Sequence, residues 1–194
     1  MRGLIWLRVL FCALVVMDIA AVPQSRSANT PGEIPVVGTY RNSEYAYVVE
    51  IPPALHAYRL GAPAPNHGFG INVPGKSNSY IWVDGKYDAT MLGSLDGAVE
   101  NEESSFAELY QLRVVDAATR QLGGAVARDV TMVAKEDAAT GAAYLRFVLA
   151  YRPSTTGGVG IVTVVALRQA VRDATVDADF EAVLQSTGLL PMPG

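Results

Sequence analysis

Three long apolar segments in the second half of the chain constrain the fold most strongly. They read VARDVTMVAK (126–135), AAYLRFVLAYR (142–152) and GIVTVVALRQ (160–169), and all are rich in residues that favour strands. The connections EDAATG and PSTTGG are too short to hold a crossover helix, so consecutive strands must run antiparallel. The sequence therefore predicts an antiparallel meander of three strands, each about ten residues long.

Shorter strands are predicted in the first half of the chain. In EYAYVVEIPP, large apolar residues from Tyr45 to Ile51 recur at every second position, which predicts a strand that ends at the two prolines. Residues 54–67 predict a loop because glycine and proline interrupt them. GFGINV (68–73) predicts a short strand, and SYIWVDGKYDA (79–89) predicts a hairpin with a type I′ turn at Asp84-Gly85.

Two helices are predicted to complete the domain. Ser105 and Glu108 have the S-x-x-E spacing of a capping box, which predicts that a polar loop (90–103) leads into a helix. Its apolar stripe comprises Phe106, Leu109, Leu112, Val115 and Leu122, and Gly123-Gly124 is its expected end. A last helix is predicted over 177–187, with Asp177 or Thr175 as its cap, Phe180, Val183 and Leu184 facing inward, and Gly188 as its end.

The first residues of the chain have the features of an export signal. Arg2 and Arg8 precede the apolar run VLFCALVVM, and small residues follow, which predicts a secretory signal peptide over 1–21 with cleavage as late as Ala28. Because Asp18 interrupts the apolar run, a membrane span is disfavoured, although an uncleaved N-terminal anchor is the alternative. Residues 22–38 then predict a flexible linker or loosely docked arm, and 39–190 a single globular domain.

Charge and cysteine content exclude several classes of protein. The chain has 15 basic and 19 acidic residues. Removing residues 1–21 takes away two arginines and one aspartate, leaving 13 basic and 18 acidic residues and a net charge of −5. An acidic surface disfavours nucleic acid. The only cysteine, Cys12, leaves with the signal, which excludes disulfides, cysteine zinc sites and a thiol nucleophile, and fits a secreted or periplasmic bacterial protein.

Two stretches of the chain carry a resemblance to a known family. YAYVVEIPPAL is similar to the opening strand, and IVTVVAL with VDADFEAVLQST to the last strand and helix, of Mog1/PsbP-like proteins of the DcrB and PsbP type. The resemblance implies an α+β fold in which two main helices pack on an antiparallel sheet, the Mog1/PsbP-like α/β/α sandwich. It also implies export, and it brings no shared catalytic residues. Thr187 and Gly188 stand where this family often has a Ser-Phe pair.

Aromatic side chains gather between residues 56 and 88 and predict a binding surface. The candidate binding residues are His67, Asn66, Tyr58, Trp82 and Tyr87, with Arg41, Arg59 and Lys86 as a possible cationic border. If these rings face outward, they form a stacking surface for a protein, peptide or glycan partner. The competing interpretation is that they fill the core, as strand aromatics usually do.

The sequence favours a non-enzymatic binding domain without a cofactor or metal. The alternative is a His-dependent hydrolase or a metal-dependent enzyme centred on His67, because imidazole titrates near neutral pH. A metal site formed by His56, His67 and either Asp84 or Asp88 lacks any diagnostic ligand spacing. Asn66-His67-Gly68 is also a good turn sequence, which favours a structural role for this histidine.

Overall fold

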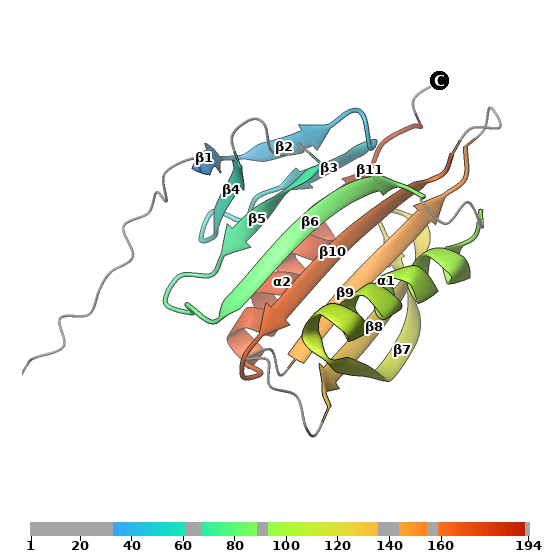
Figure 1. Ribbon diagram of the computed structural model, residues 1–194. Helices are drawn as coiled ribbons and strands as arrows, with labels where there is room; N and C mark the ends of the chain where they lie inside the picture. Colours follow the sequence, from blue (N-terminus) through green and yellow to red (C-terminus); the bar gives the residue numbers. More distant parts are fainter. Residues whose placement is uncertain (1–32, 61–66, 89–92, 136–143, 155–158, 193–194) are drawn as a thin grey trace, which may run out of the picture. The chain divides into compact units, whose positions relative to one another are not determined.

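The computed structural model describes residues 33–60, 67–88, 93–135, 144–154 and 159–192, which lie within one compact unit. Eight strands form an antiparallel main sheet (Figure 1). Their order is β1 (Glu33–Val36), β4 (His56–Leu60), β5 (Gly68–Asn72), β6 (Ser79–Tyr87), β10 (Ile161–Gln169), β9 (Tyr144–Arg152), β8 (Ala125–Ala134) and β7 (Leu112–Leu122). A small sheet contains β11 (Thr187–Leu189), β3 (Tyr47–Glu50) and β2 (Thr39–Asn42).

Two apolar clusters hold the layers together on opposite faces of the main sheet. Helix α1 (Leu95–Tyr110) packs on β7, β8 and β9, where Phe106 joins Phe147 in one buried cluster. Helix α2 (Ala174–Ser186) and the small sheet cover the other face, where Phe180 and Tyr47 are fully buried in a second cluster. The α+β sandwich with two main helices on an antiparallel sheet is therefore confirmed. Among the described helices, none has the length and apolar character needed to cross a membrane.

The predicted meander is confirmed, and so are two of the shorter strands. Strand β9 pairs with β10 on one side and with β8 on the other, all antiparallel. The predicted alternation in β3 also holds, because Tyr47 and Val49 are completely buried. Strand β5 forms where GFGINV was expected.

The loop predicted over residues 54–67 contains a strand instead. Residues 56–60 form β4, which pairs with β5 and, on its other side, with β1 at the end of the predicted arm. The placement of His56 on a loop is therefore wrong, since it begins β4. Leu55 and Ala57 are buried in the cluster beneath, and this burial outweighs the turn signals around them. Residues 61–66 lie outside the described part of the chain.

The predicted hairpin at Asp84-Gly85 is wrong, and the tight turn is elsewhere. Strand β6 runs through both residues, with Asp84 opposite Val164 and Gly85 opposite Thr163. The two-residue turn is formed by Gly123 and Gly124, whose φ angles of 55° and 86° suit a type I′ turn between β7 and β8. Gly85 instead allows the two sheets to approach closely, because it has no side chain.

The first helix begins and ends earlier than predicted. Ser94 caps α1 by accepting from the Gly97 N–H at 3.1 Å, so the capping box at Ser105 is wrong. The helix stops at Gln111, which adopts a left-handed conformation with φ 55°. Residues 112–122 form strand β7, where valine and threonine are well suited to an extended backbone.

The last helix occurs nearly where it was predicted, with different ends. The Asp173 side chain accepts from the N–H groups of Thr175 and Val176, so neither Asp177 nor Thr175 is the cap. Gly188 does not end the helix, because Thr187 already begins β11. The inward-facing residues Phe180, Val183 and Leu184 are buried as expected.

Candidate functional site

One part of the α1 face of the main sheet is hollowed into a groove. Helix α1 covers β7, β8 and β9, and no described helix covers the same face of β4 and β5 (Figure 1). The groove has a volume of about 440 Å3 and lies between these strands and the last residue of α1. Its side-chain lining includes Tyr58, Tyr80, Trp82, Tyr110 and two arginines, Arg59 and Arg168.

Three aromatic residues, Tyr58, Tyr80 and Trp82, form what we call the aromatic shelf. Tyr80 and Trp82 stack with ring centroids 5.6 Å apart and planes 22° apart, and Tyr58 lies 6.5 Å from Tyr80. A Cβ at Gly70 would lie 2.2 Å from the Tyr80 hydroxyl, so this ring extends across β5 because residue 70 is glycine. Burial, reinforced by a hydrogen bond with Tyr58, raises the pKa of Tyr80. All three shelf residues are half-buried, which leaves part of each ring accessible.

Arg168 places a cation at the border of the aromatic shelf. It lies opposite Tyr80 in the pairing of β10 with β6, and its guanidinium carbon is 5.4 Å from the Tyr110 ring centroid. Across the described ranges, Arg168 makes no ion pair. A guanidinium in this position can bind a carboxylate or other anionic group of a ligand.

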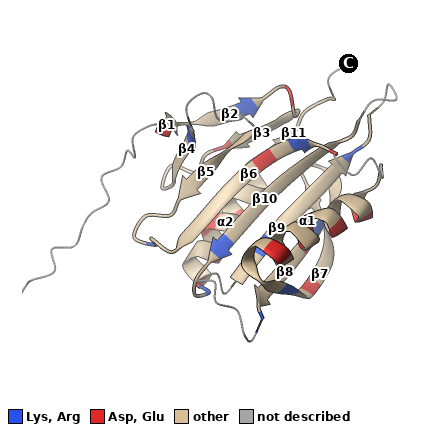
Figure 2. Cartoon of the chain, viewed as in Figure 1, with Lys and Arg blue, Asp and Glu red and all other residues tan. Residues whose placement is uncertain are grey.

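Lys86, predicted as another border residue, instead joins the sheet to α1. Its ammonium group forms an ion pair with Glu102, whose side chain is only 9% exposed. Acidic residues are frequent along α1, as Figure 2 shows, and the helix has no lysine or arginine. Arg41 lies on β2 of the small sheet, so of the three predicted border residues only Arg59 lines the groove.

His67 lies at the edge of the groove, where its main chain is held firmly. The His67 carbonyl accepts from the Tyr47 hydroxyl at 2.8 Å, from the Gly85 N–H at 3.1 Å and from Asn42 Nδ2 at 3.4 Å. Its imidazole packs beside Tyr45 with ring centroids 5.1 Å apart. Within the described ranges, His67 forms no ion pair with an acid, whereas the His-dependent alternative requires an acid or a hydroxyl in contact with this imidazole.

The two histidines are not brought together. His56 pairs with Asn72 at one end of β5, whereas His67 precedes Gly68 at the other end, about 17 Å away at the usual rise per residue. In the part of the chain that the structure describes, no three His, Cys, Asp or Glu side chains form a group suited to a metal ion. The site proposed from His56, His67 and an aspartate is therefore not assembled there.

Some of the predicted binding residues line the groove and others do not. Tyr58, Trp82 and His67 line the groove. Tyr87 does not line it; it lies beside Tyr45, with ring centroids 5.2 Å apart. Asn66 lies outside the described residues. Sequence reasoning missed Tyr110 and Arg168, because only the packing of α1 and the β6–β10 register bring them to residues 58–82.

Asp84 in the groove lining gives a test of the local electrostatics. Burial raises the pKa of this carboxyl, and Lys86 and His67 only partly oppose the effect. A raised pKa in the folded state means that the folded protein binds the Asp84 proton more tightly than the unfolded chain does. The contribution of Asp84 to the free energy of unfolding therefore falls as pH rises above about 4. Replacing Asp84 with asparagine should raise the melting temperature by a few degrees at pH 7.5 and by less at pH 4.

Asp96→Asn is the matched control for this measurement, because the Asp96 side chain is 80% exposed. Its melting temperature should change little at either pH, since exposed ion pairs contribute little. An equal gain for Asp84→Asn at both pH values would contradict the burial of a charged carboxylate.

Comparison with known proteins shows the fold. No protein-family model and no curated protein matches the sequence. The structure is similar to CyanoP, the cyanobacterial PsbP of Synechocystis, with TM-score 0.52 and 13% identity over 84% of this chain and 98% of that one. It is similar to LpqN, described as involved in cell envelope biogenesis of Mycobacterium tuberculosis, with TM-score 0.52 and 15% identity over 82% and 91%. The resemblance to Mog1/PsbP-like proteins is thereby confirmed at the level of fold.

Proposed function

We propose that this chain is an exported, non-enzymatic binding domain that holds a ring-bearing peptide or glycan on the aromatic shelf. The observation that carries the proposal is the shelf itself, set in a groove of about 440 Å3 beside Arg168, which has no ion-pair partner among the described residues. Half-buried aromatic rings bind sugar faces and aromatic side chains through stacking and burial of apolar area. The volume falls in the range of ordinary small-ligand sites.

Arg168 selects the chemistry of the ligand. After removal of residues 1–21 the chain has 18 acidic and 13 basic residues, so the guanidinium beside the shelf, which lies over the Tyr110 ring, has the opposite sign to the net charge. It favours a ligand that carries a carboxylate near its ring, as uronic sugars and peptides with an acidic residue beside an aromatic one do.

Two observations support export: the N-terminal sequence, and the similarity of the fold to that of a cell-envelope protein. Residues 1–21 have the basic, apolar and small-residue regions of a signal peptide. LpqN, which shares the fold, is described as involved in cell envelope biogenesis. The proposed location is therefore the periplasm or the exterior of a bacterial cell.

Intrinsic fluorescence can test the proposal directly. The chain has two tryptophans, Trp6 and Trp82, so a Trp6→Phe background makes Trp82 the single reporter. Screening acidic glycan and peptide arrays should yield ligands that change Trp82 emission on titration. Arg168→Ala should weaken these ligands about tenfold or more, which corresponds to about 1.4 kcal/mol.

Arg172→Ala provides a matched control, because Arg172 also lies over a tyrosine ring, Tyr144, at 5.0 Å, but is not among the groove residues. It should leave affinity unchanged. Array ligands that bind equally to wild type and Arg168→Ala, or that leave Trp82 emission unchanged, would count against the groove as the binding site.

A further inference from the structure

Strand β7 is an unusually open edge of the main sheet. It has 11 residues and lies last in the strand order, where β8 is its one partner among the described strands. The seven residues 113–119 are exposed on both faces of the sheet. Long edge strands present unpaired N–H and C=O groups, and proteins usually protect them with proline, lysine, bulges or a covering element. Residues 112–122 contain neither proline nor lysine, so the strand is protected by a bulge at Val115 and by three charged residues, Arg113, Asp116 and Arg120.

The Gly123-Gly124 turn fixes which backbone groups of β7 face outward. In a two-residue hairpin the residues that flank the turn, here Leu122 and Ala125, exchange both of their hydrogen bonds. Alternation along the strand then directs the N–H and C=O groups of residues 118 and 120 toward β8. Those of Ala117, Thr119 and Gln121 point away from the sheet, and no described strand pairs with them there.

We propose that β7 pairs antiparallel with β7 of a second copy of this chain, about a two-fold axis at Ala118. In this register Ala117 of each copy lies opposite Thr119 of the other, so outward-facing backbone groups meet and hydrogen-bond. The two main sheets join into one continuous sheet across the dimer. The central side chains, Ala117, Ala118 and Thr119, are small, so they leave room for close approach.

Charge complementarity selects this register. With the axis at Ala118, Asp116 of each copy lies opposite Arg120 of the other, in non-hydrogen-bonded positions where side chains are closest. Moving the axis to Ala117 places Arg120 opposite Val114, and moving it to Thr119 places Asp116 opposite the buried Leu122. Only the Ala118-centred pairing satisfies both charges.

Asp116 is available for this contact. It is exposed, and among the described residues it forms no ion pair. Arg120 already contacts Asp129 at 2.9 Å and Glu181 at 3.1 Å, yet its side chain keeps 26% exposure, and a guanidinium has five donors. Both side chains lie on the α2 face, so the aspartate of the second copy would extend an existing network.

Cysteine cross-linking tests the register. In a full-length chain carrying Cys12→Ser, an introduced cysteine is the only thiol. Ala118→Cys places two thiols at the axis, where a Cα separation of about 4.5–5.5 Å suits a disulfide. It should form a covalent dimer within minutes of mild oxidation. Gln121→Cys, also exposed on β7, should remain mostly uncross-linked because the two copies of residue 121 lie at opposite ends of the paired segment.

A proline variant tests the backbone pairing independently. Ala117→Pro removes an N–H that points outward, so the fold should persist while the dimer weakens at least tenfold in sedimentation equilibrium of the full-length chain. Circular dichroism checks that the variant is folded. A wild-type chain that stays monomeric at 0.1 mM (roughly the upper limit for a weak dimer), or equal cross-linking at 118 and 121, would overturn the proposal.

Discussion

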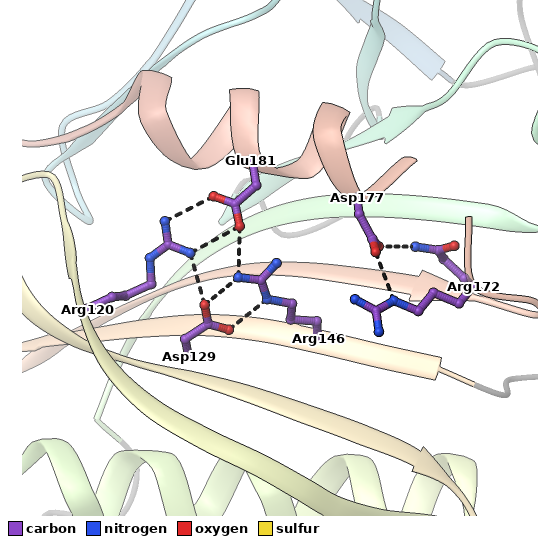
Figure 3. Close-up of polar contacts among 7 residues, drawn as sticks. Arg120, Asp129, Arg146, Arg172, Asp177 and Glu181 are labelled. Carbon is purple, nitrogen blue, oxygen red and sulfur yellow. Dashed lines mark hydrogen bonds and ion pairs between the residues drawn. The ribbon is translucent and has the colours of Figure 1, made fainter. Parts of the chain in front are cut away.

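Replacing Arg146 with alanine is expected to lower the free energy of unfolding by about 3 kcal/mol, because it removes one of the two guanidinium groups that bind the Asp129 carboxylate, whose side chain is only 13% exposed, and leaves Arg120 as the other. Arg146 Nε donates to Asp129 Oδ1 at 2.8 Å and its Nη2 to Asp129 Oδ2 at 2.5 Å. The same Nη2 lies 2.8 Å from Glu181 on α2 (Figure 3). The Arg146 guanidinium carbon also lies 5.3 Å from the Phe180 ring centroid. Urea denaturation followed by circular dichroism measures the change.

Arg128→Ala is the control for this experiment. Arg128 also pairs with an aspartate, Asp96, but that side chain is 80% exposed, so the loss should stay below about 1 kcal/mol. Similar losses for the two variants would show that the Arg146 network contributes no more than a surface ion pair.

The Arg146 effect should also depend on pH. Burial alone would raise the pKa of Asp129, but hydrogen bonds from Arg146 and Arg120 outweigh it and lower the pKa. For Glu181 too, hydrogen bonding by Arg120 and the nearby guanidinium charges outweigh burial and lower the pKa. Lowered folded-state values give stability that is present above about pH 4 and lost as pH falls further. The difference between wild type and Arg146→Ala should therefore narrow below about pH 4.

The Arg146–Asp129–Glu181 network illustrates which parts of the fold the sequence could predict and which it could not. The meander strands carry their own evidence, since they are long runs rich in apolar and β-branched residues and short connections separate them. Arg146 and Asp129 are polar residues within those strands, and α2 provides Glu181 and Phe180 to satisfy and cover them. The sequence could predict the strands from local pattern, but the pairing across elements depends on register, which no local pattern contains.

The wrong secondary-structure predictions lie where a local sequence pattern favours one structure and tertiary packing favours another. Residues 105–122 have apolar residues at helical spacing, yet Gln111 turns left-handed and the segment beyond it pairs with β8. The candidate site was predicted in part for a similar reason. Tyr58 and Trp82 belong to the aromatic-rich region, whereas Arg168 reaches the same groove only through the pairing of β10 with β6.

Gly85→Ala is expected to destabilise the protein by about 3 kcal/mol, at the upper end of overpacking effects. A Cβ at this position would lie 2.4 Å from the Tyr45 Cβ and 2.7 Å from Tyr47 Cε1. Tyr47 is completely buried and Tyr45 nearly so, and the first of these atoms is tied to the backbone, so neither can move aside cheaply. The contact of Gly85 with these tyrosines joins the small sheet to the main sheet. Disrupting it should lower the urea midpoint of unfolding of both sheets.

Gly70→Ala is the matched comparison, because it adds the same methyl group to a neighbouring strand. There the nearest atom is the Tyr80 hydroxyl at 2.2 Å, the far end of a half-buried side chain that can rotate away. Its cost should be less than half that of Gly85→Ala, and it should change Trp82 fluorescence because Tyr80 and Trp82 stack. If the free energy of unfolding of Gly85→Ala stays within about 1 kcal/mol of the wild-type value, the contact between the two sheets does not require glycine at this position. The presence of glycine at 85 within a strand would then need another explanation.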